Sequence, residues 1–260
     1  MKTYKEHYNI CKNKFGCHKT DISKLTINDN LHTETKYMSL VWSLREKVER
    51  AFENKEMYYT GNFRNSIIDT LKLPEVHLIH ELFYNQLATN FFSSHFTANR
   101  VQICTSFNSQ ADLIDQWCWH YDDVSDYHVK LFIYLSDVRS VNDAPFCYAV
   151  DDHGEPIKLE SSKIKLGERD IEICKKAPAY AGSPLPQEYV DLINADNSNK
   201  SVLGETGKCF LFSPNIVHRA TIPDENHYRT VLVYHYHPST TKSPLFDSRK
   251  LELLKNYRML

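Results

Sequence analysis

The feature that most constrains the fold is a series of short segments after Asn99 in which apolar and aromatic residues recur with the period of a β-strand. Residues 100–107 alternate, and residues 128–135 are apolar enough for a central strand. Further strands are predicted at residues 146–150, 208–212, 215–220 and 228–237. Because helical segments do not alternate with these strands, the pattern favours an antiparallel jelly-roll over a parallel sheet.

Two helices are predicted before the strands. In residues 39–52, apolar side chains recur every four residues with charged residues between them, which is typical of a helix with one buried face. A second helix is expected from Pro74 to Phe91, since proline and then Glu75 suit a first helical turn. Both are expected to pack on the sheet as scaffold. The predicted fold class is therefore mainly β with flanking helices around a double-stranded β-helix (jelly-roll, cupin-like) core.

The length of 260 residues suits a single domain of this kind. We expect a lead-in and the scaffold helices in residues 1–98, the jelly-roll core in residues 99–238 and a tail in residues 239–260. Residues 151–205 form a long polar stretch with several prolines and weak patterning. A stretch of this kind inside a domain is often a lid or binding loop, so we expect a lid-like insertion there.

The amino-acid composition limits the kinds of partner and the compartment that are expected. The chain has 31 basic and 33 acidic side chains, so no nucleic acid or other polyelectrolyte partner is expected. No apolar run is long enough to span a membrane, and the N-terminus lacks the apolar segment of a secretion signal. The seven cysteines are odd in number and scattered, which indicates reduced thiols in a cytoplasmic protein. The sequence contains no glycine-rich phosphate loop and does not predict an oligomeric state.

One stretch places two metal-ligand residue types one residue apart. His120 and Asp122 lie in an aromatic, strand-like run, and residues i and i+2 of a strand project to the same face. One imidazole, one carboxylate and a second, distant imidazole make the facial triad of non-haem Fe(II) oxygenases. His218 follows a strand and a Ser-Pro-Asn turn and is the leading third ligand. Arg229, eleven residues later, could clamp a carboxylate through two parallel hydrogen bonds.

In these motifs the chain resembles the phytanoyl-CoA dioxygenase-like family of Fe(II)/2-oxoglutarate-dependent oxygenases, over roughly residues 99–238. The segments that carry the resemblance are His120-x-Asp122, residues 129–138, the turn at 142–148, and residues 207–212 leading to His218 and Arg229. The resemblance implies that His120, Asp122 and His218 are iron ligands and that Arg229 binds the C5 carboxylate of 2-oxoglutarate. It also implies that Gln102, on the preceding strand, contacts this co-substrate.

The sequence departs from the family in two places. Many members have an Asn-Gly turn where this chain has Asn142-Asp143. Two residues past the distal histidine, where a small hydroxyl often helps to hold the co-substrate, this chain has Ala220. Thr221 comes next and is the candidate hydroxyl for that role. Neither departure removes an expected metal ligand.

Other residues near the motifs are candidates for substrate binding. Lys130 and Tyr134 alternate with Phe132 on one strand face, and Lys130 could meet an anionic substrate or co-substrate if that face points inward. His227, two residues before Arg229, could reach the mouth of the pocket.

The remaining candidates are expected to have no role in the chemistry. His235 and His237 are expected at the rim or surface rather than at a second metal site. Trp117 and Trp119 share a face with Tyr121 and are expected in the core. Cys118 shares the face of the ligands. Asp123 and Asp126 are expected in a solvated turn.

The resemblance implies an enzyme that uses Fe(II), 2-oxoglutarate and O₂ to hydroxylate an unactivated C–H bond of a small-molecule metabolite, releasing succinate and CO₂. A halogenating relative has a small residue at the position of Asp122, so the carboxylate favours hydroxylation. Two alternatives stay open at the level of sequence. One is desaturation or oxidative cyclisation at the same site, and the other is a non-catalytic jelly-roll ligand-binding protein. The motifs do not name the substrate.

Overall fold

The computed structural model describes residues 27–28, 31, 34–55, 58–60, 64–67, 69–92, 95–108, 117–122, 127–151, 153–158, 183–185, 199–242 and 245. Most of the expected lead-in, the centre of the 151–205 insertion, the acidic pair Asp123 and Asp126, and most of the C-terminal tail lie outside the described residues.

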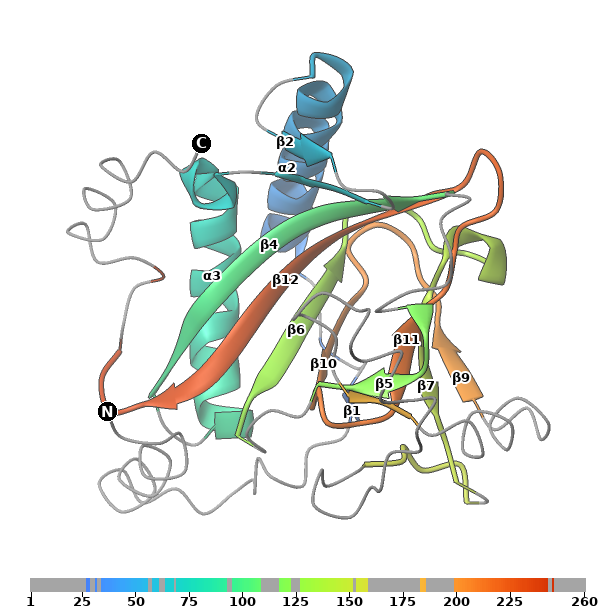
Figure 1. The fold of residues 1–260 in the computed structure, drawn as a ribbon. Coiled ribbons are helices and arrows are strands. Elements are labelled where there is room, and N and C mark those ends of the chain that lie inside the picture. Colours follow the sequence, from blue (N-terminus) through green and yellow to red (C-terminus); the bar gives the residue numbers. More distant parts are fainter. Residues whose placement is uncertain are drawn as a thin grey trace.

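Two antiparallel sheets form the core of the protein (Figure 1). In spatial order, the seven-stranded major sheet contains β1 (Ile27–Asn28), β10 (Cys209–Phe212), β6 (Val129–Tyr134), β12 (Tyr228–Ser239), β4 (His95–Phe107), β3 (Arg64–Ile67) and β2 (Tyr58–Thr60). The five-stranded minor sheet contains β8 (Ser183–Pro184), β5 (His120–Tyr121), β11 (His218–Ala220), β7 (Phe146–Ala149) and β9 (Asn199–Val202). Apart from β2, β3 and β4, neighbouring strands are not consecutive in the chain, as in a jelly-roll, and this confirms the predicted fold class.

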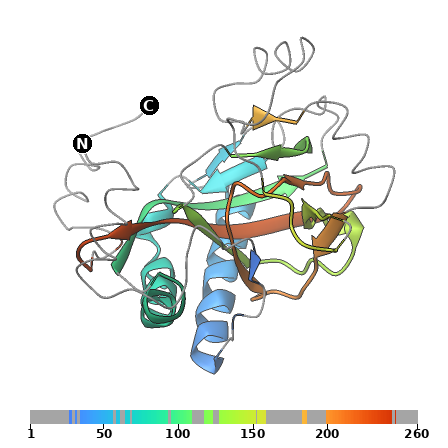
Figure 2. The ribbon, with the colours of Figure 1, turned by 90° about the horizontal axis from the view of Figure 1, so that it is seen from below.

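The two long helices cover one face of the major sheet. They are α2 (Thr35–Glu53) and α3 (Pro74–Leu87), and α3 continues into a π-helical turn, η3 (Ala88–Phe92). Figure 2 shows both helices on one side of β4 and β12, with the minor sheet on the other side. Short 3₁₀ turns lie at η2 (Thr70–Lys72) and η5 (Val141–Asp143). Both scaffold helices are therefore confirmed, and none of the described helices is long and apolar enough to cross a membrane.

Strand alternation divides the side chains of β12 between two environments. Leu232, Tyr234 and Tyr236 belong to the core between the sheet and the helices, where Tyr234 Oη donates a hydrogen bond to the carbonyl of Val76 at 2.7 Å. Val231, Val233 and His235 project from the other face, and residues of this set line a cavity between the two sheets. The alternation that predicts the strand therefore also determines which of its side chains face the cavity.

The structure contains strands that the sequence pattern does not predict. Strands β2 and β3 pair with each other, and β3 extends the edge of the major sheet by pairing with β4, where Ser66 faces Cys104. Residues 64–67 read Arg-Asn-Ser-Ile and have little apolar alternation, because this strand, next to the edge of the sheet, is only partly buried. The strand that carries His120 is shorter than expected and ends at Tyr121. Asp122 lies just beyond it, with its N–H donating to the carbonyl of Pro214 at 2.9 Å.

Candidate metal centre and cavity

Cross-strand pairing brings two histidines together on the minor sheet. His120 of β5 lies directly opposite His218 of β11, and their ring centroids are 4.3 Å apart. Each Nδ1 is 2.8 Å from a backbone carbonyl two residues earlier, that of Cys118 for His120 and that of Ile216 for His218. A carbonyl can only accept a hydrogen bond, so each Nδ1 carries the hydrogen. This leaves the Nε2 lone pair of each ring available to a metal ion.

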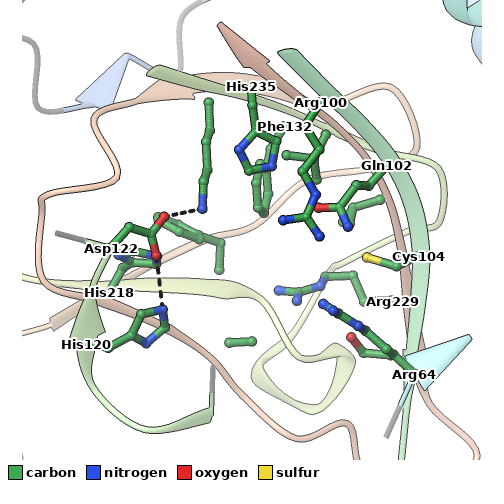
Figure 3. A pocket seen from close by; sticks show the side chains of 16 residues that line it. Arg64, Arg100, Gln102, Cys104, His120, Asp122, Phe132, His218, Arg229 and His235 are labelled. Carbon is green, nitrogen blue, oxygen red and sulfur yellow. Dashed lines mark hydrogen bonds and ion pairs between the residues drawn. The ribbon is translucent and has the colours of Figure 1, made fainter. Parts of the chain in front are cut away.

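Asp122 completes a group of three. Its Oδ1 lies 3.7 Å from His120 Nε2 and 3.9 Å from His218 Nε2 (Figure 3). All three ligand atoms lie within 4.8 Å of one another, and no other group of this kind occurs in the part of the chain that the structure describes. The structure thus brings together the three residues that the sequence singles out as metal ligands.

The donor set fits a divalent iron ion. Two bonds of about 2.1 Å to a shared ion span at most about 4.2 Å, so the distances from Asp122 to both histidines suit one ion between them. Two imidazoles and one carboxylate are the donors of the facial triad, which leaves coordination positions open for other ligands. Both histidines are almost fully buried, and Asp122 is partly buried.

The second oxygen of Asp122 is held by Lys130. Lys130 Nζ donates a hydrogen bond to Asp122 Oδ2, and both side chains are mostly buried. Burial alone would raise the pKa of Asp122, but the charge of Lys130 and the neighbouring His218 and His120 outweigh it and hold the pKa well below its usual range. Asp122 is therefore ionised at neutral pH, as a metal ligand must be.

His218 is in the neutral form that can bind a cation. Burial and, to a lesser extent, the neighbouring His120 together lower the pKa of His218 to about 3. A neutral imidazole keeps the lone pair that a metal requires. No protonated form of His218 therefore competes with the ion near neutral pH.

A cavity of about 130 Å³ lies between the triad and the major sheet. Its wall combines the three expected ligands with inward-facing residues of β3, β4, β6, β7, β11 and β12. The lining residues are Arg64, Arg100, Gln102, Cys104, Ser106, His120, Asp122, Lys130, Phe132, Phe146, His218, Ala220, Arg229, Val231, Val233 and His235. Figure 3 shows Arg64, Arg100 and Arg229 on the side of the cavity opposite the triad, with their guanidinium groups pointing inward.

Arg229 is the buried cation of this wall. It is 5% exposed, and its Nε and Nη1 have no hydrogen-bond partner. Buried guanidinium donors without partners are costly, so they mark a place where a ligand can supply the missing acceptors. A guanidinium group also carries a positive charge that attracts a carboxylate.

Of the other predicted site residues, two line the cavity and three do not. Gln102 and Lys130 line the cavity. Thr221, Tyr134 and His227 do not belong to its lining. Thr221 Oγ1 donates to the carbonyl of Pro145 at 3.4 Å, Tyr134 Oη donates to the carbonyl of Val202 at 2.8 Å, and His227 Nδ1 pairs with Asp143 Oδ1 at 2.7 Å. The hydroxyl expected near the co-substrate is therefore engaged elsewhere, and Ala220 faces the cavity in its place.

The rim or surface position predicted for two histidines is wrong. His235 is 8% exposed and lines the cavity, and its Nδ1 lies 3.2 Å from His128 Nε2. His237 is 3% exposed, with its ring centroid 4.3 Å from that of His128. The reason is that Pro238 does not end the strand: β12 continues to Ser239.

The tryptophans lie where the sequence predicts them. Trp117 and Trp119 are buried, and Trp119 packs with Tyr121 in a cluster apart from the cavity. Cys118, which shares a strand face with the ligands, does not belong to the cavity lining that the structure describes.

Two arginines of the cavity are not predicted by the sequence pattern. Arg64 comes from the unpredicted strand β3, and Arg100 stands at a strand position that carries no motif. For Arg100 a signal existed, because it is two residues before Gln102 and therefore shares its face of β4. For Arg64 the sequence offers no comparable signal.

Comparison with known proteins supports the fold. The sequence matches no family model, and a search of curated protein sequences found no match. The fold is similar to that of EctD from S. alaskensis with bound Fe, with a TM-score of 0.54 and 9% identity over 86% of this chain and 75% of that one. The same protein with 2-oxoglutarate and 5-hydroxyectoine gives a TM-score of 0.52 and 11% identity, covering 91% and 80%. AviO1 from Streptomyces viridochromogenes Tue57 gives 0.51 and 14%, covering 82% and 89%.

Proposed function

We propose that this protein is an Fe(II)/2-oxoglutarate-dependent dioxygenase that hydroxylates an unactivated C–H bond of a small-molecule metabolite and releases succinate and CO₂. The observation that carries the proposal is one cavity with a His-Asp-His triad on one wall and a buried arginine with unpartnered donors on the other. The similar fold of EctD, whose structures hold Fe and 2-oxoglutarate, supports it.

His120, Asp122 and His218 would hold the iron. With O₂ and 2-oxoglutarate, the bound iron would supply the oxidising power for the C–H bond. The protein fixes the three donors before the ion arrives, because both histidine rings are held through Nδ1 and Asp122 is held by Lys130. Lys130 also keeps Asp122 Oδ2 occupied, which leaves Oδ1 as the oxygen directed at both histidines.

Arg229 would bind the C5 carboxylate of 2-oxoglutarate. Its guanidinium group has two unpartnered donors, Nε and Nη1, in a buried setting, where charge-assisted hydrogen bonds to a carboxylate are strong. Gln102 lines the same cavity and can donate or accept a hydrogen bond from the co-substrate. The co-substrate would thus be gripped at one end by the major sheet and at the other by the triad on the minor sheet.

The apolar part of the wall would exclude water from the reaction. Phe132, Phe146, Val231 and Val233 line the cavity, and Phe146 packs parallel to the ring of His218 with centroids 5.4 Å apart. A dry wall strengthens the electrostatic contacts to the co-substrate and protects reactive species from side reactions.

The test is succinate formation from 2-oxoglutarate. Purified protein with Fe(II), O₂ and 2-oxoglutarate would be assayed across a panel of amino acids, short acyl compounds and natural-product scaffolds. We expect substrate-dependent succinate release that His218→Ala abolishes and that His153→Ala leaves intact, since His153 lies on an exposed turn. Equal succinate release by the two variants would overturn the proposal, as would a wild-type protein that forms no succinate with any compound of the panel.

A further inference from the structure

The two histidines of the candidate metal centre are held opposite each other by very little backbone pairing. β5 is two residues long, and within the described residues its register with β11 consists of the pair His120 and His218 (Figure 1). On its other side β5 pairs with β8, which is also two residues long. Strands this short give a sheet little stability of their own. Side-chain contacts must therefore help to keep His120 opposite His218.

One such contact lies directly behind the two histidines. With His120 opposite His218 in an antiparallel pair, the neighbouring position places Arg219 opposite Trp119. These two side chains project from the other face of the minor sheet, away from the cavity. Arg219 Cζ lies 4.5 Å from the centroid of the Trp119 ring, which is within the range of a cation–π contact. The contact therefore joins the segment of β5 to β11 beside the histidine pair.

The surroundings strengthen this contact. Trp119 is 2% exposed and packs in a buried cluster with Tyr121, Leu185 and Val217. Arg219 is partly buried, and its Nε has no hydrogen-bond partner among the residues that the structure describes. A cation over an aromatic ring is attracted more strongly when water is excluded from it. The ring of Trp119 therefore stabilises the charge of Arg219, and the attraction holds the two segments together.

The contact bears on the metal centre through the metal-free protein. When β5 separates from β11, His120 leaves its place opposite His218 and the two imidazoles no longer face one ion. Metal binding then has to restore the register. The apparent dissociation constant rises as the fraction of molecules with both histidines in place falls.

We propose that Arg219 and Trp119 are positioning residues for the metal centre, because their cation–π contact keeps β5 in register with β11 before the ion binds. This inference rests on the proposed function, since it takes His120 and His218 as metal ligands. Neither Arg219 nor Trp119 belongs to the described lining of the cavity. Their effect on the ion is therefore transmitted through the two strands that carry the histidines.

The test measures the affinity for Co(II) by competition with a chelator. Arg219→Met removes the charge and keeps most of the side-chain length, and we expect a dissociation constant about tenfold higher, as the loss of a desolvated cation–π contact allows. Arg219→Lys retains a cation and should stay within about threefold of the wild type. Arg139→Met is the control, because the side chain of Arg139 is 65% exposed and pairs with Asp137 and Glu205 outside the cavity. Its Co(II) affinity should equal that of the wild type.

Hydrogen exchange of the metal-free protein is the second measurement. In Arg219→Met, the amides of residues 119–121 should exchange faster than in the wild type, while those of β12 keep their protection. A merely structural role would give a different result, because a general loss of stability speeds exchange in both regions.

Four results would overturn the proposal. Arg219→Met could bind Co(II) as tightly as Arg139→Met, or its amides at residues 119–121 could exchange as slowly as in the wild type. Exchange could be faster throughout the chain, or Arg219→Lys could bind Co(II) as weakly as Arg219→Met, which would show that the charge is not what matters. Failure of the proposed metal centre is a separate result, in which His218→Ala leaves the Co(II) affinity unchanged, and that result overturns both proposals.

Discussion

Replacing Arg229 by glutamine should weaken 2-oxoglutarate binding strongly. The guanidinium group is 5% exposed and has two unpartnered donors, Nε and Nη1, on the cavity wall that faces the triad. A hydrogen bond to a charged group contributes about 1.5–3 kcal/mol. Glutamine keeps a donor but loses the charge and the fork, so a loss of about 2–4 kcal/mol is expected. That corresponds to a dissociation constant about 30-fold to 700-fold higher.

The measurement is an anaerobic titration of Fe(II)-loaded protein with 2-oxoglutarate, for the wild type, Arg229→Gln and a matched control. Arg139→Gln is the control, because Arg139 is exposed and pairs with Asp137 and Glu205 outside the cavity. Its affinity for 2-oxoglutarate should stay within about twofold of the wild type, since surface substitutions rarely exceed about 0.5 kcal/mol.

Thermal unfolding separates a binding defect from a folding defect in this comparison. A loss of 1 kcal/mol in stability shifts the midpoint of a chain of this size by about 2–4 °C, so a variant that melts within that range of the wild type is folded. A folded Arg229→Gln protein that binds 2-oxoglutarate as tightly as Arg139→Gln would refute the assignment of Arg229 to the co-substrate.

Two further predictions concern the metal site and the buried histidines. Lys130→Met should weaken metal binding about 10-fold to 100-fold, because Asp122 loses the donor that orients its carboxylate, and a competition titration against a chelator measures this. The exposed Lys200→Met is its control, and equal metal affinity in the two variants would count against the role of Lys130. The free energy of unfolding should fall as the pH is lowered from 7 to 5, because burial lowers the pKa of His80 and of His237 to about 4. Between about 6.5 and 4 the unfolded chain binds protons that the folded protein excludes, so each histidine contributes a slope of up to about 1.4 kcal/mol per pH unit. Urea titrations at the two pH values check this, and a double variant His80→Gln/His237→Gln with the same slope as the wild type would contradict it.

Local residue pattern predicts one half of the candidate metal centre, because His120 and Asp122 lie one residue apart in a strand-like run. His218 joins them only through the long-range pairing of β11 with β5, which local pattern does not determine. The structure also shows what orients the two imidazole rings: each Nδ1 donates a hydrogen bond to a backbone carbonyl within its own segment. The period of β12 likewise predicts which residues face the cavity, apart from the end of the strand, where Pro238 is accommodated opposite Phe96.

The cationic wall is less accessible to sequence reasoning, because long-range pairing builds it. Arg64 reaches the cavity only through the pairing of β3 with β4, two strands separated in the chain by α3. Thr221 has a side chain suited to the co-substrate but does not line the cavity, because its hydroxyl donates a hydrogen bond to the carbonyl of Pro145. Strand pairing brings Arg64 to the cavity, and a competing hydrogen bond keeps Thr221 away from it; residue type alone predicts neither.

The measurement that tests the central claim most directly is the anaerobic visible spectrum of the protein with Fe(II) and 2-oxoglutarate. A triad of His120, Asp122 and His218 with Arg229 across the cavity predicts a weak charge-transfer band, produced when the co-substrate chelates the iron. The band should disappear in His218→Ala and persist in His153→Ala. A wild-type protein without the band, or a band unaffected by His218→Ala, would contradict the assignment of this cavity to an iron and 2-oxoglutarate site.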